Sequence, residues 1–165
     1  MPLCYTLDMD HYYFAYGMNT NPGAMSERLS ADGVARSIGA AHLQEWRFRF
    51  AVHADVMPEA NQSVAGVLWH ITDEHLARLD AREGYPHYYT RQTLPVVCQN
   101  QVYQAIVYHM TPGQLDFPPD EGYWTMLEEG YDHFRVSKAQ MYRALNDSHQ
   151  CLLTEYQESA TLNRL

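Results

Sequence analysis

The stretch from residue 79 to residue 91 reads Leu79-Asp80-Ala81-Arg82-Glu83-Gly84-Tyr85-Pro86-His87-Tyr88-Tyr89-Thr90-Arg91. Leu79 follows Leu76 at helical spacing, and Gly84 and Pro86 predict that the helix ends in a turn here. The tyrosines beyond the turn favour a strand. One carboxylate, Glu83, therefore lies at the junction between a helix and an aromatic strand.

Two physical effects can raise the pKa of Glu83. The negative end of the helix dipole disfavours the ionised carboxylate. Burial among the tyrosines that follow would act in the same direction. A carboxyl group with a pKa near neutrality is suited to act as a general acid or base. Charge and position also describe a solvated Glu83 paired with Arg82 or Arg91, and on these grounds alone that arrangement is the commoner one.

A second unusual stretch near the start of the chain is Tyr13-Phe14-Ala15-Tyr16-Gly17-Met18-Asn19. A glycine turn between a strand and a helix start exposes main-chain N–H groups, which can bind an anion. The stretch lacks the Walker and dinucleotide glycine patterns, so a carboxylate fits it better than a nucleotide. The alternative is that Gly17 only permits a turn.

The rest of the chain predicts an α+β domain, with strands first and helices last, around a mostly antiparallel sheet that can close. Strands or extended segments are expected at 11–16, 34–41, 46–53, 64–71, 88–98 and 102–110. In the 46–53 strand, Trp46, Phe48, Phe50 and Val52 should face the core. Helices are expected at 22–29 after an Asn19 or Asn21 cap, from Thr72 to Gly84, and as two or three helices over 122–157. Loops are expected at 32–33, 58–61 and 111–120.

Composition restricts the possible partners. The 165 residues suit one domain spanning 1–165. Eleven Lys and Arg against 20 Asp and Glu give a net charge of −9, which argues against a nucleic-acid partner. Residues 1–14 lack a basic start and an apolar signal core, and no run reaches membrane-spanning length. We therefore expect a cytoplasmic location and no membrane partner.

Metal and acyl-enzyme chemistry are disfavoured. The nine histidines show no His-x-His or His-Glu-x-x-His spacing, so no metal site is expected. Cys4, Cys98 and Cys151 are widely spaced and predict reduced thiols rather than a disulfide framework. No Gly-x-Ser-x-Gly motif marks a serine nucleophile.

The two stretches together resemble the gamma-glutamylcyclotransferase-like superfamily. Its members carry a Tyr-Gly-Ser-Asn-type loop after the first strand, and a Leu-Asp-x-x-Glu-Gly helix end followed by a Tyr-x-Arg strand. The matching segments are Phe14-Ala15-Tyr16-Gly17-Met18-Asn19, Leu79-Asp80-Ala81-Arg82-Glu83-Gly84 and Tyr89-Thr90-Arg91. The resemblance covers about residues 12–145, and the two motifs in this order are more specific than either alone.

The resemblance implies an α+β fold with a small, mixed, mostly antiparallel six-stranded barrel-like sheet, short flanking helices and a helical C-terminus. It implies a γ-glutamyl cyclotransferase that converts a small γ-glutamyl amino acid or amine to 5-oxoproline and the free amine. Glu83 is then the general acid/base, and no cofactor is implied, because nucleophile and electrophile share one molecule. The implied substrate-binding residues are Tyr16, Gly17, Met18, Asn19, Thr20, Tyr89 and Tyr123.

Met18 departs from the resemblance, because members usually have serine there. Main-chain N–H donors would survive this change, whereas a hydroxyl contact would not. This change leaves open a non-catalytic small-carboxylate-binding or regulatory module. A related γ-glutamyl amide hydrolase that uses the same base also stays open, as does a structural interaction protein whose cavity is filled by side chains. The expected partner is a small γ-glutamyl molecule, and the expected assembly is a monomer or homodimer.

Overall fold

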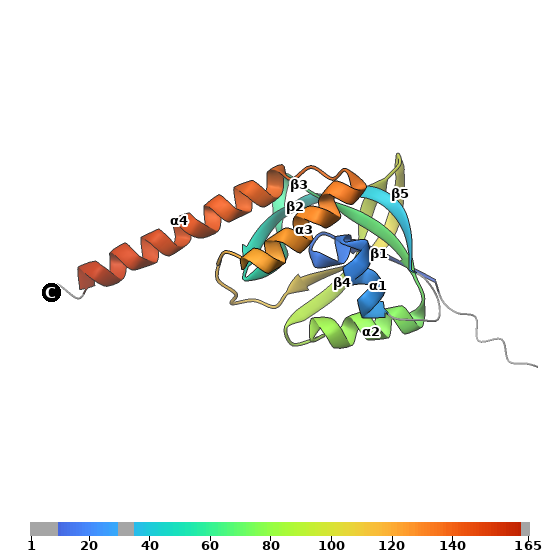
Figure 1. Cartoon of the computed structure of the whole chain (residues 1–165), viewed down its shortest axis with the longest axis horizontal. Helices are drawn as coiled ribbons and strands as arrows, with labels where there is room; N and C mark the ends of the chain where they lie inside the picture. The colour runs from blue at the N-terminus through green and yellow to red at the C-terminus, as the bar shows by residue number, and fades with distance from the viewer. Residues whose placement is uncertain (1–9, 30–34, 163–165) are drawn as a thin grey trace, which may run out of the picture.

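A computed structural model describes residues 10–29 and 35–162 of the chain (Figure 1). The predicted loop at 32–33 and Cys4 lie outside these residues. The strands are β1 (His11–Ala15), β2 (Arg36–Ala51), β3 (His53–Ile71), β4 (Tyr89–Cys98) and β5 (Gln101–Met110). The helices are the 3-10 turn η1 (Met18–Thr20), α1 (Pro22–Leu29), α2 (Asp73–Glu83), α3 (Glu121–Phe134) and α4 (Ala139–Leu162).

The strands form a closed barrel in the order β1-β3-β2-β4-β5. Only β1 and β5 pair in parallel, and this pairing closes the barrel; the other described pairs are antiparallel. The predicted α+β class with a mixed, mostly antiparallel barrel is confirmed, but the count of six strands is wrong. The described residues form five, because the segments expected at 34–41 and 46–53 run together as the single long strand β2.

The long β2–β3 hairpin also explains two local errors. The loop expected at 58–61 lies within β3, where Pro58 pairs with Trp46 and Ser63 pairs with Gln44. The four residues between Pro58 and Ser63 face a single β2 residue, so the extra chain is absorbed as a bulge instead of a strand end. Val52, expected to be buried, is 44% exposed because β2 ends at Ala51 and Val52 forms the turn.

The helix boundaries follow the predicted caps. The Thr72 side chain accepts a hydrogen bond from the His75 N–H at 3.2 Å, and Gly84 ends α2 in the left-handed conformation with φ 64°. Asn21, not Asn19, caps α1, because its Oδ1 accepts from the N–H groups of Gly23 and Ala24. The predicted C-terminal helical region is two helices, and the second extends beyond residue 157 to Leu162.

The helices are arranged around one part of the barrel. In Figure 1, α1 lies beside α2, α3 crosses near the η1 turn, and α4 begins on the barrel and then projects away from it. The barrel interior and the helix contacts are filled by large apolar side chains such as Phe14, Phe50, Leu68 and Leu79. Within the described ranges, no helix is long and apolar enough to cross a membrane.

A buried ion pair anchors the start of β3. The Asp55 carboxylate accepts from Arg49 Nε at 2.8 Å and from the Met110 N–H at 2.8 Å. Arg49 also donates to Asp116 at 3.0 Å, which ties the segment after β5 to the hairpin. The neighbouring residue Ala54 is thereby fixed in the wall of a pocket near the end of α2.

Candidate functional site

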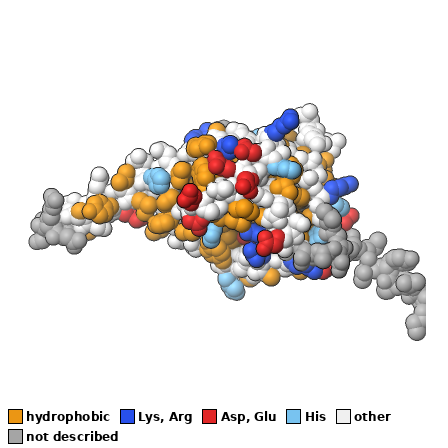
Figure 2. Space-filling model, in the orientation of Figure 1, with side chains coloured by type: hydrophobic (Ala, Val, Ile, Leu, Met, Phe, Trp, Pro, Cys, Tyr) orange, Lys and Arg blue, Asp and Glu red, His pale blue; other side chains and the backbone are white. Residues whose placement is uncertain are grey.

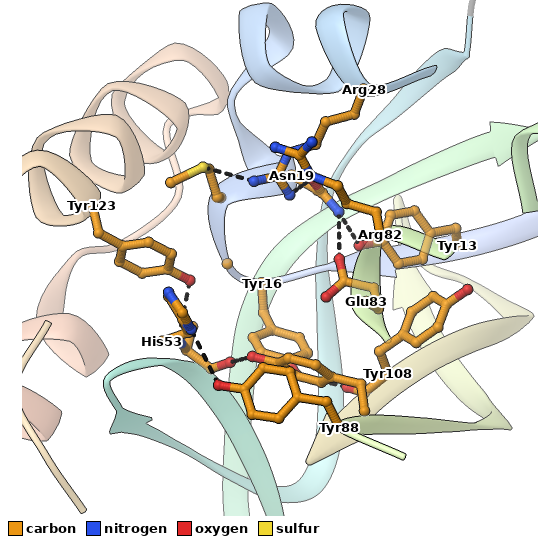
Figure 3. Close-up of a pocket in the computed structure, with 14 residues that line it drawn as sticks. Tyr13, Tyr16, Asn19, Arg28, His53, Arg82, Glu83, Tyr88, Tyr108 and Tyr123 are labelled. Atoms are coloured by element: carbon orange, nitrogen blue, oxygen red, sulfur yellow. Dashed lines mark hydrogen bonds between the residues drawn. The ribbon is translucent and has the colours of Figure 1, made fainter. Parts of the chain in front are cut away.

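A pocket of about 250 Å³ opens where the η1 turn, the end of α2 and the start of β4 meet (Figure 3). Its volume is at the small end of ligand sites and suits a small molecule. Six of the thirteen tyrosines line it, namely Tyr13, Tyr16, Tyr88, Tyr89, Tyr108 and Tyr123. The other lining residues are Gly17, Met18, Asn19, Arg28, His53, Ala54, Arg82 and Glu83.

The two stretches singled out in the sequence meet in this pocket. Glu83 is the last residue of α2, and Asn19 lies in the η1 turn after β1. The Asn19 Nδ2 group donates to Glu83 Oε1 at 3.3 Å and to the Tyr13 hydroxyl at 2.9 Å. Figure 3 shows the Glu83 carboxyl directed into the pocket beneath Asn19.

Burial raises the pKa of Glu83 above its ordinary value. Three interactions oppose this shift: the Arg28 charge, the hydrogen bond from Asn19 and the Arg82 charge. The predicted direction of the shift is therefore confirmed. A carboxyl group with a raised pKa exchanges protons more effectively near neutrality than a solvated one.

Arg91 does not pair with Glu83. Its guanidinium donates to the two Asp80 oxygens at 2.8 and 3.1 Å, and the Tyr108 hydroxyl donates to Asp80 Oδ1 at 2.6 Å. Asp80 is one turn before Glu83 on α2, so these contacts hold the end of that helix against β4 and β5. The carboxylate that forms the ion pair in this stretch is Asp80, and Glu83 is left facing the pocket.

Gly17 is closely packed, and its backbone angles lie outside the left-handed region. A Cβ atom there would lie 3.1 Å from the Tyr123 hydroxyl and 3.2 Å from the Ala54 Cβ. Among the described residues, the main-chain N–H groups of Gly17 and Asn19 donate no backbone hydrogen bond, and that of Met18 points toward the Tyr123 hydroxyl. This turn therefore presents main-chain donors at the pocket.

Thr20 lies apart from the other predicted binding residues. Its side chain is fully buried, and its hydroxyl donates to the Gly17 carbonyl at 2.8 Å. Its main-chain N–H also donates to the Gly17 carbonyl, at 3.0 Å. Thr20 therefore stabilises the turn through the Gly17 carbonyl and does not line the pocket.

The predicted tyrosines differ in how their hydroxyl protons are used. Tyr16 donates to the Tyr108 carbonyl at 2.6 Å, and Tyr89 donates to the Ala54 carbonyl at 2.7 Å. Tyr123 instead accepts from the Ala54 N–H at 3.0 Å, and within the described chain no hydrogen bond uses its proton. Burial raises the pKa of Tyr123 to about 12, so it stays protonated and can donate to a ligand. Tyr16 and Tyr89 shape the pocket wall.

His53 and Tyr88 lie at the rim of the pocket. The His53 Nδ1 atom is 3.2 Å from the Tyr88 hydroxyl, and its ring lies 5.1 Å from the Tyr123 ring. Burial lowers the pKa of His53, an effect that Asp120 opposes and Arg28 reinforces. His53 is therefore a neutral hydrogen-bonding group near pH 7.

Seven pocket residues were not predicted as catalytic or ligand-binding from the sequence, and three of them are basic: Arg28, His53 and Arg82. They give the pocket two cations against one carboxylate, in a chain whose net charge is −9. By contrast, Figure 2 shows acidic side chains gathered over α3, which carries Glu121, Glu128, Glu129 and Asp132. The difference favours an anionic ligand. Arg82 precedes Glu83 directly, but nothing in the sequence marks Arg28 or His53.

No metal site is evident in the parts of the chain that the structure describes. No group of three or more His, Cys, Asp or Glu residues there could hold a metal ion. Cys98 and Cys151 are free thiols, and burial raises the pKa of Cys98.

The closed, mixed, mostly antiparallel barrel with its surrounding helices matches the gamma-glutamyl cyclotransferase-like fold. The family profile described as "Gamma-glutamyl cyclotransferase, AIG2-like" matches residues 13–126. This is more than half of the 165 residues, so the chain belongs to that family. A search of curated protein sequences finds no match.

Solved structures agree on the fold. An uncharacterized human protein aligns with a TM-score of 0.69 at 23% identity, over 76% of this chain and 80% of that one. A protein named gamma-glutamyl cyclotransferase aligns with a TM-score of 0.69 at 22% identity, over the same shares. YkqA of Bacillus subtilis aligns with a TM-score of 0.68 at 21% identity, over 83% of this chain but 54% of YkqA.

Proposed function

We propose that this protein is a γ-glutamyl cyclotransferase in which Glu83 is the general acid/base. The observation that carries the proposal is the position of Glu83. It is the sole carboxylate among the described pocket-lining residues, it faces the glycine turn, and burial raises its pKa. Membership of the family and the likeness to a solved gamma-glutamyl cyclotransferase support the same reaction.

The proposed reaction is an intramolecular aminolysis. Glu83 takes a proton from the α-ammonium group of a γ-glutamyl compound, and the amine nitrogen attacks the γ-carbonyl carbon. A carbon–nitrogen bond closes the five-membered ring, and the ring nitrogen releases its remaining extra proton to solvent. The bond to the leaving amine then breaks as Glu83 returns its proton to the departing nitrogen. The products are 5-oxoproline and the free amine. Because both reacting groups belong to one molecule, positioning supplies much of the acceleration and no cofactor is needed.

Groups other than Glu83 are available in the pocket to bind the α-carboxylate of the γ-glutamyl substrate. In this proposal, the main-chain N–H groups of Gly17 and Asn19 bind it at the turn, as such donors bind anions elsewhere. The Tyr123 hydroxyl and the positive charges of Arg28 and Arg82 support the same end of the pocket. Because these donors belong to the main chain, Met18 in place of the family's usual serine is compatible with binding.

Product analysis tests this proposal. The purified protein is incubated with a panel of γ-glutamyl amino acids and γ-glutamyl amines, and the products are identified by mass spectrometry. The incubation is carried out in oxygen-18-labelled water. Cyclisation gives 5-oxoproline that contains no oxygen from this water. A γ-glutamyl amide hydrolase would instead release glutamate carrying one labelled oxygen.

A binding module would give a third result. Glutamate-like ligands would then raise the melting temperature, since a ligand that binds the folded state stabilises it, while no product would form from any member of the panel. Either glutamate release or binding without turnover would contradict the proposed cyclotransferase. The proposed enzyme is cytoplasmic, needs no cofactor and acts on a small γ-glutamyl substrate.

A further inference from the structure

Arg28, which lines the pocket, holds two consecutive residues of the glycine turn. It lies in the last turn of α1 and is half-buried. Its NH1 group donates to Asn19 Oδ1 at 2.6 Å, and its NH2 group donates to the Met18 sulfur at 2.9 Å. A single guanidinium therefore fixes both side chains that the turn directs toward the pocket.

These contacts decide which way the Asn19 amide points. A guanidinium has only donors, so the Asn19 carbonyl oxygen must be the atom that faces Arg28. The NH2 group then faces the opposite side, where it donates to Tyr13 and to Glu83. If the amide were reversed, the Asn19 carbonyl oxygen would face the Glu83 carboxylate, so two acceptors would meet. The Asn19 NH2 group would face the Arg28 guanidinium, so two donors would meet.

We propose that Arg28 is a positioning residue for Glu83: it acts through Asn19 by holding the amide with its donor toward the carboxylate. This inference rests on the proposed role of Glu83 as the general base. Charge-assisted hydrogen bonds of this kind contribute more than neutral ones. Arg28 contacts the turn and not the reacting atoms, so its effect on the reaction is indirect.

Other groups also act on Glu83 and must be separated from this effect. Arg82 comes from α2 and His53 from β3. The six pocket tyrosines contribute hydroxyls from β1, β4, β5, α3, the start of the glycine turn and the segment between α2 and β4. Arg28 and Arg82 both lower the pKa of Glu83 by their charge. Arg28 differs because it alone of the two hydrogen-bonds Asn19 in the described structure. Because the Arg28 charge also acts on Glu83 more strongly than the Arg82 charge, the effect of Arg28 must be compared with and without Asn19 to separate charge from amide orientation.

The test is a double-mutant cycle on Arg28 and Asn19 in which the pKa of the Glu83 carboxyl is measured. Carbon-13 NMR follows titration of the Glu83 side-chain carboxyl in the full-length protein, with Glu83→Gln used to assign the signal. Arg28→Met should raise the Glu83 pKa when Asn19 is present, because a charge and an oriented donor are both lost. In an Asn19→Ala background the same substitution should give a clearly smaller shift. Equal shifts in the two backgrounds would overturn the proposal.

Arg82→Met is the matched control, since it removes a pocket cation without touching the amide. It should shift the Glu83 titration less than Arg28→Met does, and this comparison holds even if the Asn19→Ala protein fails to fold. An Arg82→Met shift as large as that of Arg28→Met would show that Arg28 acts by charge alone and would overturn the proposal.

Turnover gives an independent readout of the same idea. For Arg28→Met, kcat/KM for 5-oxoproline release at neutral pH should fall by about tenfold to a hundredfold, the loss expected for one hydrogen bond to a charged group. The acidic limb of its pH profile should move to higher pH, because the base must lose its proton to act. An unmoved limb would contradict the proposal. If wild-type protein forms no 5-oxoproline, the proposed function fails, while the NMR cycle still decides the role of Arg28.

Discussion

Glu83 is held between opposing influences at the scale of a single residue. Burial against tyrosines disfavours its charge, whereas Asn19, Arg28 and Arg82 favour it. Burial is the larger effect, so the pKa is raised. This balance suits a group that must both accept and return a proton within one catalytic cycle.

The raised pKa predicts how Glu83→Gln changes stability with pH. In the folded protein Glu83 binds its proton more tightly than in the unfolded chain, so raising the pH through this range reduces the free energy of unfolding. Glutamine does not titrate and escapes this loss. The melting temperature of Glu83→Gln relative to wild type should therefore rise as the pH is increased above about 4, the ordinary pKa of a glutamate. The check is thermal unfolding across that range.

The size of that change is limited because Glu83 is partly exposed. The direction is the test: a relative melting temperature that stays constant or falls with pH would contradict a raised pKa. Glu74→Gln in the same helix is the control, since Glu74 lies at the exposed start of α2 and forms a surface pair with Arg78.

Sequence reasoning found Glu83 and missed Arg28 for a physical reason. Glu83 lies at a helix end followed by glycine, and both features are local in the sequence. Arg28 reaches the turn only because α1 folds back over it, nine residues after Asn19. A half-buried arginine on a short helix looks like any surface cation until the tertiary contact is known.

At the scale of elements, the packing of α3 against the glycine turn determines the shape of the site. Gly130 in α3 touches the turn so closely that a Cβ atom would meet the Thr20 hydroxyl and lie 2.6 Å from the Asn21 nitrogen. Tyr131 is the next residue of α3, and its hydroxyl donates to the Tyr16 carbonyl at 2.7 Å. The turn is thus held by α3 on one side and by Arg28 on the other.

Gly130→Ala should therefore destabilise the protein, although helix propensity alone predicts the opposite. Alanine is favoured over glycine within a helix by roughly 0.5–1 kcal/mol. Overpacking against main-chain atoms typically costs about 1–3 kcal/mol and forces the backbone to shift. We expect a lower melting temperature in thermal unfolding and a reduced kcat/KM for 5-oxoproline release, because the shift moves the main-chain donors.

Gly122→Ala is the matched control in the same helix. Gly122 is exposed, and a Cβ atom there would lie 3.3 Å from the nearest heavy atom, Asp120 Oδ1. It should leave stability and turnover close to wild type. If Gly130→Ala behaved like Gly122→Ala, the described contact between α3 and the turn would be wrong.

Sequence patterns predicted which helices and strands exist better than they predicted where each one begins and ends. Caps at Thr72, Asn21 and Gly84 are local signals and were confirmed. Proline at residue 58 suggested a loop, but in the structure it pairs with Trp46 beside a bulge. Bulges depend on the partner strand, so a pattern read along one segment does not reveal them.

At the scale of the whole molecule, the barrel brings two distant stretches to one pocket. The parallel pairing of β1 with β5 and the antiparallel pairing of β1 with β3 fix the glycine turn at the barrel end. The helix that follows β3 then delivers Glu83 to the same place. Family resemblance predicted this meeting and the barrel, whereas the residue pattern alone predicted a sheet that can close.

The long helix α4 divides into two parts. Its first part is buried on the barrel, where Gln140 bonds to both main-chain groups of Ala65 at 2.8 and 2.7 Å. Its outer part projects away, and Figure 2 shows hydrophobic side chains along it. Leu153 and Tyr156 there are 55% and 76% exposed. The pocket lies among the other elements, so its chemistry does not depend on this outer part.

The most direct measurement of the central claim compares 5-oxoproline release by wild type, Glu83→Gln and Glu74→Gln on the same γ-glutamyl substrate. General acid–base catalysis contributes about 10²–10⁴-fold, so Glu83→Gln should lower kcat by at least about 100-fold. It should do so while remaining folded at the assay temperature. Glu74→Gln should match wild type. Wild-type turnover in folded Glu83→Gln would contradict the assignment of Glu83 as the general acid/base.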